Sequence, residues 1–301
     1  YAAVCGISED EMLSQMSADI DMVAGEMALS REQLMEKLKS YYDGYHFTWP
    51  SPDIYNPFSL VCAFADRKIG AYWFGSGTPT YLIEMLRTYH VAPSQIGGGT
   101  AMAADFDAPT ERMIGITPLL YQSGYITIKG YDQDADIFTL DIPNKEVRIG
   151  LMRSLLPYYV SAGRSIEAST TIARIYLALR NEDLDGAFRL LQTFLSTVPY
   201  TGNTDYEGHY QQMLYIIFSL LGYYVDVEVR TPRGRVDMVL RTATTLYVVE
   251  VKLDKSAETA MQQIDLKQYP ERFALCGLPV IKVAVNFNRE THTISDWIIS
   301  K

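Results

Sequence analysis

The sequence predicts a multi-domain α/β protein: a mostly helical N-terminal region followed by a compact mixed α/β domain. The chain has 301 residues, which is long for a single hydrophobic core. Its hydrophobic fraction of 48% and charged fraction of 21% are those of an ordinary globular protein. Helical spacing of apolar residues dominates before residue 115, whereas short apolar runs separated by turn residues dominate after residue 203.

The first predicted domain covers residues 1–114 and is helical. Residues 9–42 have helical periodicity, and Ser30 followed by Gln33 forms a capping box at the start of one of these helices. The stretch 43–57 is aromatic and contains Pro and Gly, so it predicts a packed loop.

The second predicted domain covers residues 115–202. A short helix is followed by two strands around a turn at 132–136, which is the outline of a winged-helix unit. The predicted wing carries one Lys and three Asp between Lys129 and Phe138, so it favours a packing role over contact with phosphate. Three helices are then predicted, at 146–160, 165–180 and 184–197, of which the last two form an antiparallel pair.

The third predicted domain covers residues 203–301. Its predicted elements are a helix at 205–221, strands at 223–230, 234–241 and 245–253, a helix at 257–268, a strand at 279–286 and a last element at 293–299. This order, α-β-β-β-α-β, describes a compact domain of roughly 100 residues.

Two charged residues interrupt the apolar strand "TLYVVEVKLD", which runs from Thr245 to Asp254. Glu250 and Lys252 are two residues apart and therefore share one face of this strand. The preceding strand poses the same problem, because Asp237 lies between Val236 and Met238. Ionised groups in a core are costly unless they are paired, hydrogen-bonded or bound to a metal.

A divalent cation resolves the conflict between these charges. The two strands are predicted to be antiparallel neighbours, which brings Asp237 beside Glu250. Two adjacent carboxylates repel each other unless a cation lies between them, and Mg²⁺ or Mn²⁺ prefers such oxygen ligands. With Lys252 beside it, this arrangement suits hydrolysis of a phosphodiester. Glu207 offers a third carboxylate, and Gln263 on the next helix a group that bonds water or the DNA backbone.

An alternative interpretation is structural. A Glu-x-Lys pair is common on half-exposed sheets, where it forms a cross-strand ion pair. An ancestral nuclease site is favoured by the combination of five residues: Asp237, Glu250, Lys252, Glu207 and Gln263.

The charge and the cysteines limit the partners and the compartment. The net charge is −10, yet residues 203–301 carry 11 Lys and Arg against 12 Asp and Glu, so nucleic-acid contact is compatible with this part alone. The three cysteines are far apart and predict reduced thiols in a cytoplasmic protein. The sequence has neither a membrane span nor a signal peptide, and the absence of an initial Met indicates a fragment. It does not predict an oligomeric state.

The segments "GRVDMVL", "YVVEVKL" and "AMQQIDLKQY" together resemble the PD-(D/E)XK nuclease superfamily, whose domains have a restriction-endonuclease-like α/β fold. The resemblance implies that Asp237, Glu250 and Lys252 are catalytic, that Glu207 and Gln263 assist them, and that the Val251 carbonyl joins Asp237, Glu250 and Glu207 as a metal ligand. It further implies bound Mg²⁺ or Mn²⁺ and DNA as substrate. Val236 stands where the motif has proline.

Segments before residue 203 are similar to bacterial AAA-ATPase-like proteins that carry such a nuclease-like domain at their C-terminus. They include "LKSYYDGYHF", "IYNPFSL" and "LLYQSGYITIKGYD". The sequence has no G-x-x-x-x-G-K-[ST] motif, so no ATP site and no ATPase activity are expected. The "GSGT" at 75–78 reads as a loop in which Thr78 caps a helix with Pro79 in its first turn. The alternative function is an inactive nuclease fold that serves an ATPase as a regulatory or interaction module, which the acidic character of residues 1–202 favours.

Overall fold

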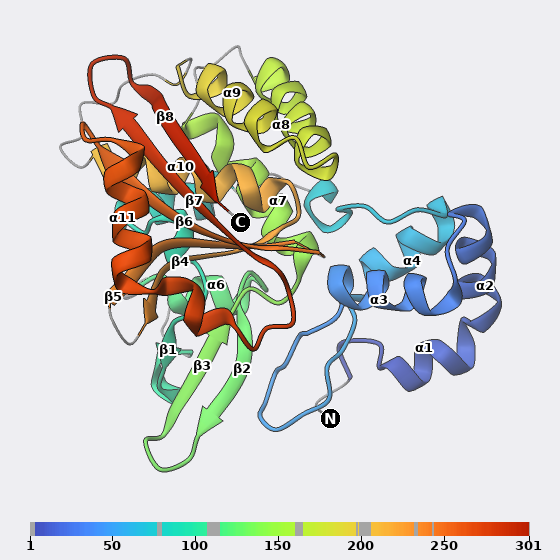
Figure 1. Cartoon of the computed structure of the whole chain (residues 1–301). Coiled ribbons are helices and arrows are strands. Elements are labelled where there is room, and N and C mark those ends of the chain that lie inside the picture. Colours follow the sequence, from blue (N-terminus) through green and yellow to red (C-terminus); the bar gives the residue numbers. More distant parts are fainter. Residues whose placement is uncertain are drawn as a thin grey trace. The chain divides into compact units, whose positions relative to one another are not determined.

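The computed structural model describes residues 4–76, 80–106, 115–159, 165–196, 198, 206–231, 234–242 and 244–300. These residues form a mixed α/β structure with 11 α-helices and two sheets, as the sequence predicts (Figure 1). The chain divides into two compact units, Tyr1–Ser154 and Leu155–Lys301. None of the helices in the described ranges is long and apolar enough to span a membrane.

The described residues of the first unit form the α-helices α1 (Glu9–Gln15), α2 (Ser17–Glu26), α3 (Arg31–Tyr42), α4 (Pro57–Asp66), α5 (Thr80–Thr88), α6 (Thr117–Gln122) and α7 (Lys145–Leu155). The capping box predicted for α3 is present. The Ser30 hydroxyl accepts from the Gln33 N–H at 3.2 Å, and the Gln33 side chain accepts from the Ser30 N–H at 2.9 Å. Helices α1 to α4 share a core that includes Met12, Ile20, Leu34, Leu38 and Leu60. The predicted cap at Thr78 and Pro79 lies outside the described residues.

A small antiparallel sheet completes the first unit. Its strands are β1 (Thr100–Ala101), β2 (Thr127–Asp132) and β3 (Ile137–Asp141), in the order β1-β3-β2. Helix α6 and the β2–β3 hairpin are the helix and hairpin predicted after residue 115. Strand β1 lies in the first predicted domain, for which no strand was predicted, because two residues are too few to show an alternating pattern. The winged-helix relationship of this part stays a prediction.

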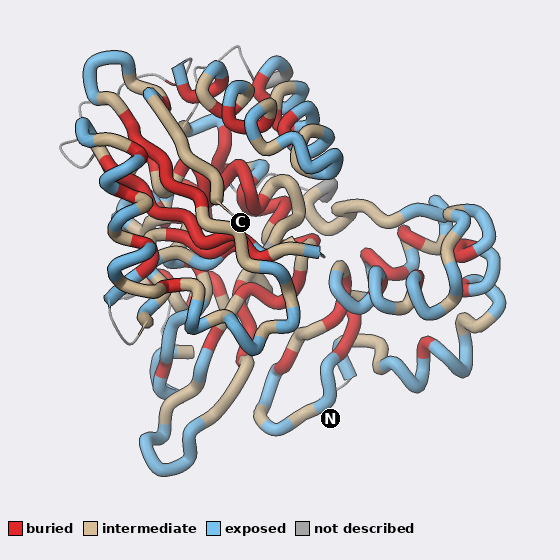
Figure 2. The backbone as a smooth tube through the Cα atoms, viewed as in Figure 1, coloured by how far each residue is buried: buried red, intermediate tan, exposed pale blue. Residues whose placement is uncertain are grey.

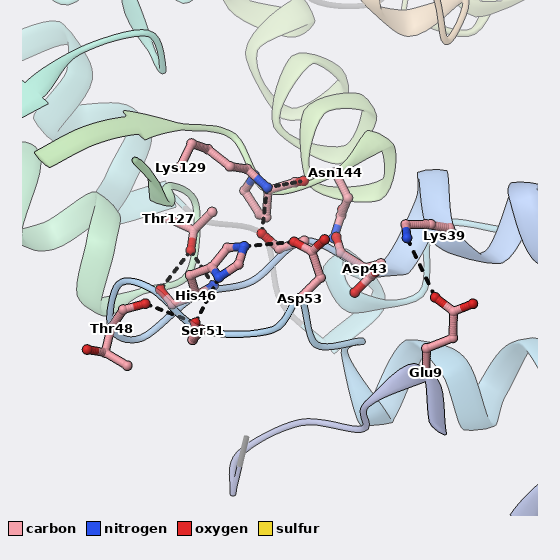
Figure 3. A network of polar contacts seen from close by, with 12 residues as sticks. Glu9, Lys39, Asp43, His46, Thr48, Ser51, Asp53, Thr127, Lys129 and Asn144 are labelled. Carbon is pink, nitrogen blue, oxygen red and sulfur yellow. Dashed lines mark hydrogen bonds and ion pairs between the residues drawn. The ribbon is translucent and has the colours of Figure 1, made fainter. Parts of the chain in front are cut away.

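A polar network holds the loop between α3 and α4 (Figure 3). The buried His46 ring lies between Ser51 and Asp53, with Nδ1 2.8 Å from the Ser51 hydroxyl and Nε2 2.7 Å from the Asp53 carboxylate. The Thr127 hydroxyl of β2 accepts from the His46 N–H at 2.8 Å and donates to the His46 carbonyl at 2.9 Å. These contacts give the predicted packed loop its fixed position on β2.

Asp43 occupies the buried end of the same network. Its main-chain carbonyl accepts from the Asn144 amide at 3.1 Å, and the neighbouring Gly44 carbonyl accepts from the Lys129 ammonium at 2.6 Å. One carboxylate oxygen of Asp43, Oδ1, is buried without a hydrogen-bond partner in the described part of the chain. Burial raises the pKa of Asp43 to about 6.

In the second unit, the residues that the structure describes form a five-stranded sheet and the helices that cover it. The helices are α8 (Ser165–Arg180), α9 (Leu184–Leu195), α10 (Tyr206–Leu220) and α11 (Ala257–Lys267), and the strands are β4 (Tyr224–Thr231), β5 (Gly234–Arg241), β6 (Leu246–Leu253), β7 (Val280–Asn288) and β8 (Thr293–Ser300). The strand order is β4-β5-β6-β7-β8. Strands β6 and β7 are parallel and the other neighbours antiparallel, so α11 is the crossover between two parallel strands.

The central strands of this sheet are buried on both sides (Figure 2). Ala260 and Ile264 of α11 pack in one cluster with Val248 and Ala284. On the opposite face, Tyr210 of α10 stacks on Phe287, with ring centroids 4.2 Å apart. Helices α10 and α11 therefore cover opposite faces of the sheet.

The helical pair α8–α9 belongs to the same unit as the five-stranded sheet. Helix α9 lies along β8: the Gln192 amide donates to the Ile294 carbonyl at 2.6 Å, and the Thr293 hydroxyl donates to the Gln192 carbonyl at 2.6 Å. The Trp297 indole donates to Asp185 at 2.8 Å and stacks on Phe188. The predicted domain boundaries near residues 114 and 202 stay predictions.

Candidate active site

The charged residues of β6 form a buried ion pair. Glu250 is 0% exposed and Lys252 is 8% exposed. The Lys252 ammonium lies 2.7 Å from Oε1 of Glu250 and 3.2 Å from the Val251 carbonyl oxygen, to which it also donates. The two side chains share one face of the strand, as the alternation of the sequence predicts.

The third predicted residue, Asp237, lies where strands β5 and β6 stop pairing. Their ladder runs from Arg241 opposite Leu246 to Met238 opposite Val249, and its next step would place Asp237 opposite Glu250. Instead of continuing the ladder, the Asp237 carboxylate accepts the N–H of Val251 at 2.8 Å. The structure thus brings the carboxylates of Asp237 and Glu250 to one place together with the Lys252 ammonium.

The electrostatics of this cluster centre on Glu250. Burial raises the pKa of Glu250, and the negative charge of Asp237 raises it further. The hydrogen bond and charge of Lys252 lower it, as does a hydrogen bond from the Asp237 backbone. Glu250 Oε2 is fully buried and has no hydrogen-bond partner among the described residues. A buried carboxylate oxygen of this kind is costly unless a cation or a proton satisfies it. The cluster therefore has the charge and an available oxygen for a cation.

Gln211 of α10 is a site residue that sequence reasoning missed. Its side-chain amide donates to the main-chain carbonyl of Asp237 at 2.8 Å. Gln211 follows Glu207 by four positions, a spacing that predicts one shared face of a helix. This helical spacing was the signal that would have found it. The side chain of Glu207 itself lies outside the described residues, and its role stays a prediction.

Gln263 reaches the site through a tyrosine. The Gln263 amide donates to the Tyr269 hydroxyl at 3.3 Å, and that hydroxyl donates to the Arg235 carbonyl at 2.7 Å. Burial raises the pKa of Tyr269, and the charges of Glu250 and Asp237 contribute to the increase. The structure therefore connects Gln263 with the backbone of β5 through Tyr269 rather than directly with the two carboxylates.

The donor set suits a hard divalent cation. Asp237 and Glu250 offer carboxylate oxygens, and the Val251 carbonyl belongs to the same cluster. Mg²⁺ and Mn²⁺ are commonly bound by one or two carboxylates together with water. Among the side chains that the structure describes, no group of three or more His, Cys, Asp and Glu gathers for a metal.

Comparison with known families defines the class of this domain. Residues 205–297 match the family model described as the PD-(D/E)XK nuclease superfamily. The matched segment contains the five-stranded sheet up to Trp297 together with α10 and α11. The chain therefore carries a PD-(D/E)XK nuclease superfamily domain at residues 205–297, as the three sequence segments indicated.

A curated relative extends the comparison over almost the whole chain. It is a protein of Azotobacter chroococcum mcd 1 described as "Uncharacterized protein in vnfD 5'region", and it is 30% identical over 312 aligned positions. The alignment covers 99% of this chain and 57% of the relative, so the chain spans little more than half of the relative's length. No solved structure matches the chain significantly. The nuclease family match does not reach the segments before residue 205.

Proposed function

We propose that this chain is a metal-dependent nuclease that hydrolyses phosphodiester bonds of DNA at the cluster formed by β5 and β6. The observation that carries the proposal is the convergence of Asp237 and Glu250 beside Lys252, with a buried Glu250 oxygen that lacks a partner. The family match supports the nuclease class, and the near-neutral charge of residues 203–301 is compatible with a nucleic-acid substrate.

Each residue of the cluster has a proposed role. Asp237, Glu250 and the Val251 carbonyl would hold Mg²⁺ or Mn²⁺, with Glu207 as a further carboxylate. A bound divalent ion neutralises phosphate charge and lowers the pKa of a bound water. Lys252 orients the attacking water and stabilises charge that develops on the phosphate. Gln263 acts through Tyr269 by fixing the strand that carries Asp237.

Cleavage by the Asp237→Asn variant tests this function. Labelled double-stranded DNA, single-stranded DNA and RNA are incubated with the full chain and Mg²⁺ or Mn²⁺. We expect Asp237→Asn to reduce DNA cleavage about 100-fold or more, because it removes a charge from the reacting centre. Asp265→Asn, the same change on the exposed side of α11, should cleave like the wild type.

Two outcomes would contradict the nuclease proposal. One is cleavage by Asp237→Asn at the wild-type rate. The other is cleavage by the wild type that persists after divalent ions are removed with a chelator.

A second candidate function is a nuclease fold that serves as a regulatory or interaction module. The observation that favours it is the direct contact between Glu250 and Lys252, since a buried ion pair of this kind also has a purely structural use. Calorimetric titration with Mn²⁺ separates the two functions. The nuclease requires metal binding that Asp237→Asn removes, whereas the module predicts neither metal nor nucleic-acid binding.

The proposed attachment to an ATPase rests on the resemblance of the segments before residue 203. We propose that residues 1–202 derive from an AAA-ATPase-like protein and do not themselves bind ATP. Equilibrium dialysis of the chain with labelled ATP tests the second part, and saturable binding would contradict it.

A further inference from the structure

The pairing between β4 and β5 is interrupted at one position. The ladder runs in constant register from Tyr224 opposite Arg241 to Thr231 opposite Gly234, but the pair of Glu228 with Asp237 is missing. Glu228 has a φ of +54°, in the left-handed region. The other non-glycine residues with positive φ in the described ranges lie in turns, in connections or at helix ends, whereas Glu228 lies inside a strand.

Hydrogen-bond alternation shows what this interruption does to Asp237. The Thr242 N–H donates to the Thr245 carbonyl at 2.9 Å at the β5–β6 turn, so even-numbered residues of β5 bond β6 and odd-numbered ones bond β4. In a regular strand the main-chain groups of Asp237 would therefore face β4 and pair with Glu228. With that pair missing, the Asp237 carbonyl accepts from Gln211 at 2.8 Å.

The interruption also changes which side chains of β5 face α11. Val236 and Val239 both belong to the cluster that contains Ala260 and Ile264 of α11. In a regular strand, two residues three positions apart lie on opposite faces of the sheet. The strand must therefore be irregular between Val236 and Val239, and this segment contains Asp237. An irregularity of this kind redirects the side chain at its centre.

We propose that Glu228 is a positioning residue for the candidate active site. Its left-handed backbone opens the β4–β5 ladder opposite Asp237, and this freedom lets the Asp237 carboxylate turn to the Val251 N–H. The backbone of Glu228 carries this role, because its carboxylate is exposed and pairs with Arg235 at 3.2 Å, away from Glu250. The inference rests on the proposed function for its catalytic meaning.

A series of substitutions at Glu228 separates the effect of its backbone conformation from the effect of its carboxylate charge. Glu228→Gly, Glu228→Ala and Glu228→Val all remove the carboxylate and its pair with Arg235. Glycine adopts positive φ readily, alanine less so, and the β-branched valine strongly favours a regular strand. We expect the gap in the β4–β5 ladder to stay open in Glu228→Gly, to close partly in Glu228→Ala and to close most in Glu228→Val.

Two measurements on the full chain report the position of Asp237. The first is hydrogen exchange of the Val251 N–H by NMR, without metal. We expect Glu228→Gly to exchange at the wild-type rate and Glu228→Val about tenfold or more faster, because the bond to Asp237 is lost. The second is calorimetric affinity for Mn²⁺, which we expect to fall about tenfold or more in Glu228→Val and to change little in Glu228→Gly.

The outcomes distinguish this inference from the proposed function. Equal Val251 exchange in Glu228→Gly and Glu228→Val would overturn the inference; if Glu228→Val does not fold, the comparison of Gly with Ala decides in the same way. Absence of Mn²⁺ binding and of cleavage in the wild type would overturn the proposed function instead. The exchange series would still decide the role of Glu228 in that case.

Discussion

At the residue scale, Glu250 and Lys252 make each other's burial possible. A buried ion pair contributes little net stability compared with apolar residues of similar size, but loss of one partner leaves an uncompensated charge. Glu250 is the more sensitive of the two, because its side chain is fully buried and one of its oxygens already lacks a partner.

We expect Lys252→Met to lower the free energy of unfolding by about 3–5 kcal/mol, because it leaves the Glu250 carboxylate unpaired. The double variant Glu250→Gln with Lys252→Met should recover most of this loss, since neither charge remains. Urea denaturation at pH 7 measures both values. A double variant as unstable as Lys252→Met alone would show that the pair is not the source of the effect.

Asp43 makes stability depend on pH in a defined direction. Its pKa in the folded protein is raised from 3.8 to about 6 by burial. The folded state therefore keeps a proton that the unfolded state has already released, so the free energy of unfolding falls as pH rises from about 4 to about 6 and levels off above that. The shift corresponds to about 3 kcal/mol at neutral pH.

We expect Asp43→Asn to remove this dependence, because asparagine does not titrate. The variant should gain stability relative to the wild type between pH 4 and pH 7, with the difference between them growing by about 3 kcal/mol. Urea titrations at several pH values measure it. Parallel stability curves for the two proteins would contradict the raised pKa of Asp43.

At the element scale, local patterns predicted most helices and strands within a few residues. The capping box of Ser30 and Gln33 is an example, because both residues act within one turn of helix. The strand with Glu250 and Lys252 is another, since alternation alone places both on one face.

Contacts between segments far apart in the chain could not be predicted from the sequence. Nothing local indicates that β1 pairs with β3. The left-handed conformation of Glu228 has no sequence signal either, because glutamate is not a residue that favours positive φ. The role of Tyr269 was not predicted because its contact with the Arg235 carbonyl joins residues 34 positions apart.

The cap of α3 offers a direct test of an element that the sequence predicted. We expect Ser30→Ala to lower the free energy of unfolding of the first unit by about 1 kcal/mol, because it leaves the Gln33 N–H without its acceptor. Ser40→Ala is the matched control, because the Ser40 hydroxyl only donates to the Lys37 carbonyl within the same helix. Equal effects of the two changes, measured by urea denaturation, would contradict the capping role.

At the scale of the whole molecule, the boundary between units differs from the boundary of the family match. The match begins at residue 205, whereas the second compact unit begins at Leu155 and includes α8 and α9. Helix α9 covers β8 through bonds from Gln192 and through the stacking of Phe188 on Trp297. The helical pair α8–α9 therefore supplies part of the packing of the nuclease-like sheet.

Two fragments test how far the second unit extends. We expect a fragment of residues 155–301 to unfold cooperatively, because it keeps both its sheet and the helices that cover it. A fragment of residues 203–301 lacks α9, so Trp297 loses its stacking on Phe188, and Thr293 and the Ile294 carbonyl lose their bonds to Gln192. It should be less stable by on the order of 3 kcal/mol, the value expected when one large apolar side chain loses burial and two hydrogen bonds are lost.

Urea unfolding followed by circular dichroism compares the two fragments, with unfolding of the full chain as the reference. Equal stability of 155–301 and 203–301 would show that α8 and α9 contribute nothing to the sheet. The complementary variant Trp297→Phe in the longer fragment keeps the stacking on Phe188 but loses the bond to Asp185. It should cost only about 1 kcal/mol, because one hydrogen bond is lost while the apolar contact remains. Suppose instead that Trp297→Phe loses as much stability as removal of α8 and α9. The Trp297–Asp185 bond, rather than apolar burial, would then attach the helical pair α8–α9 to the sheet.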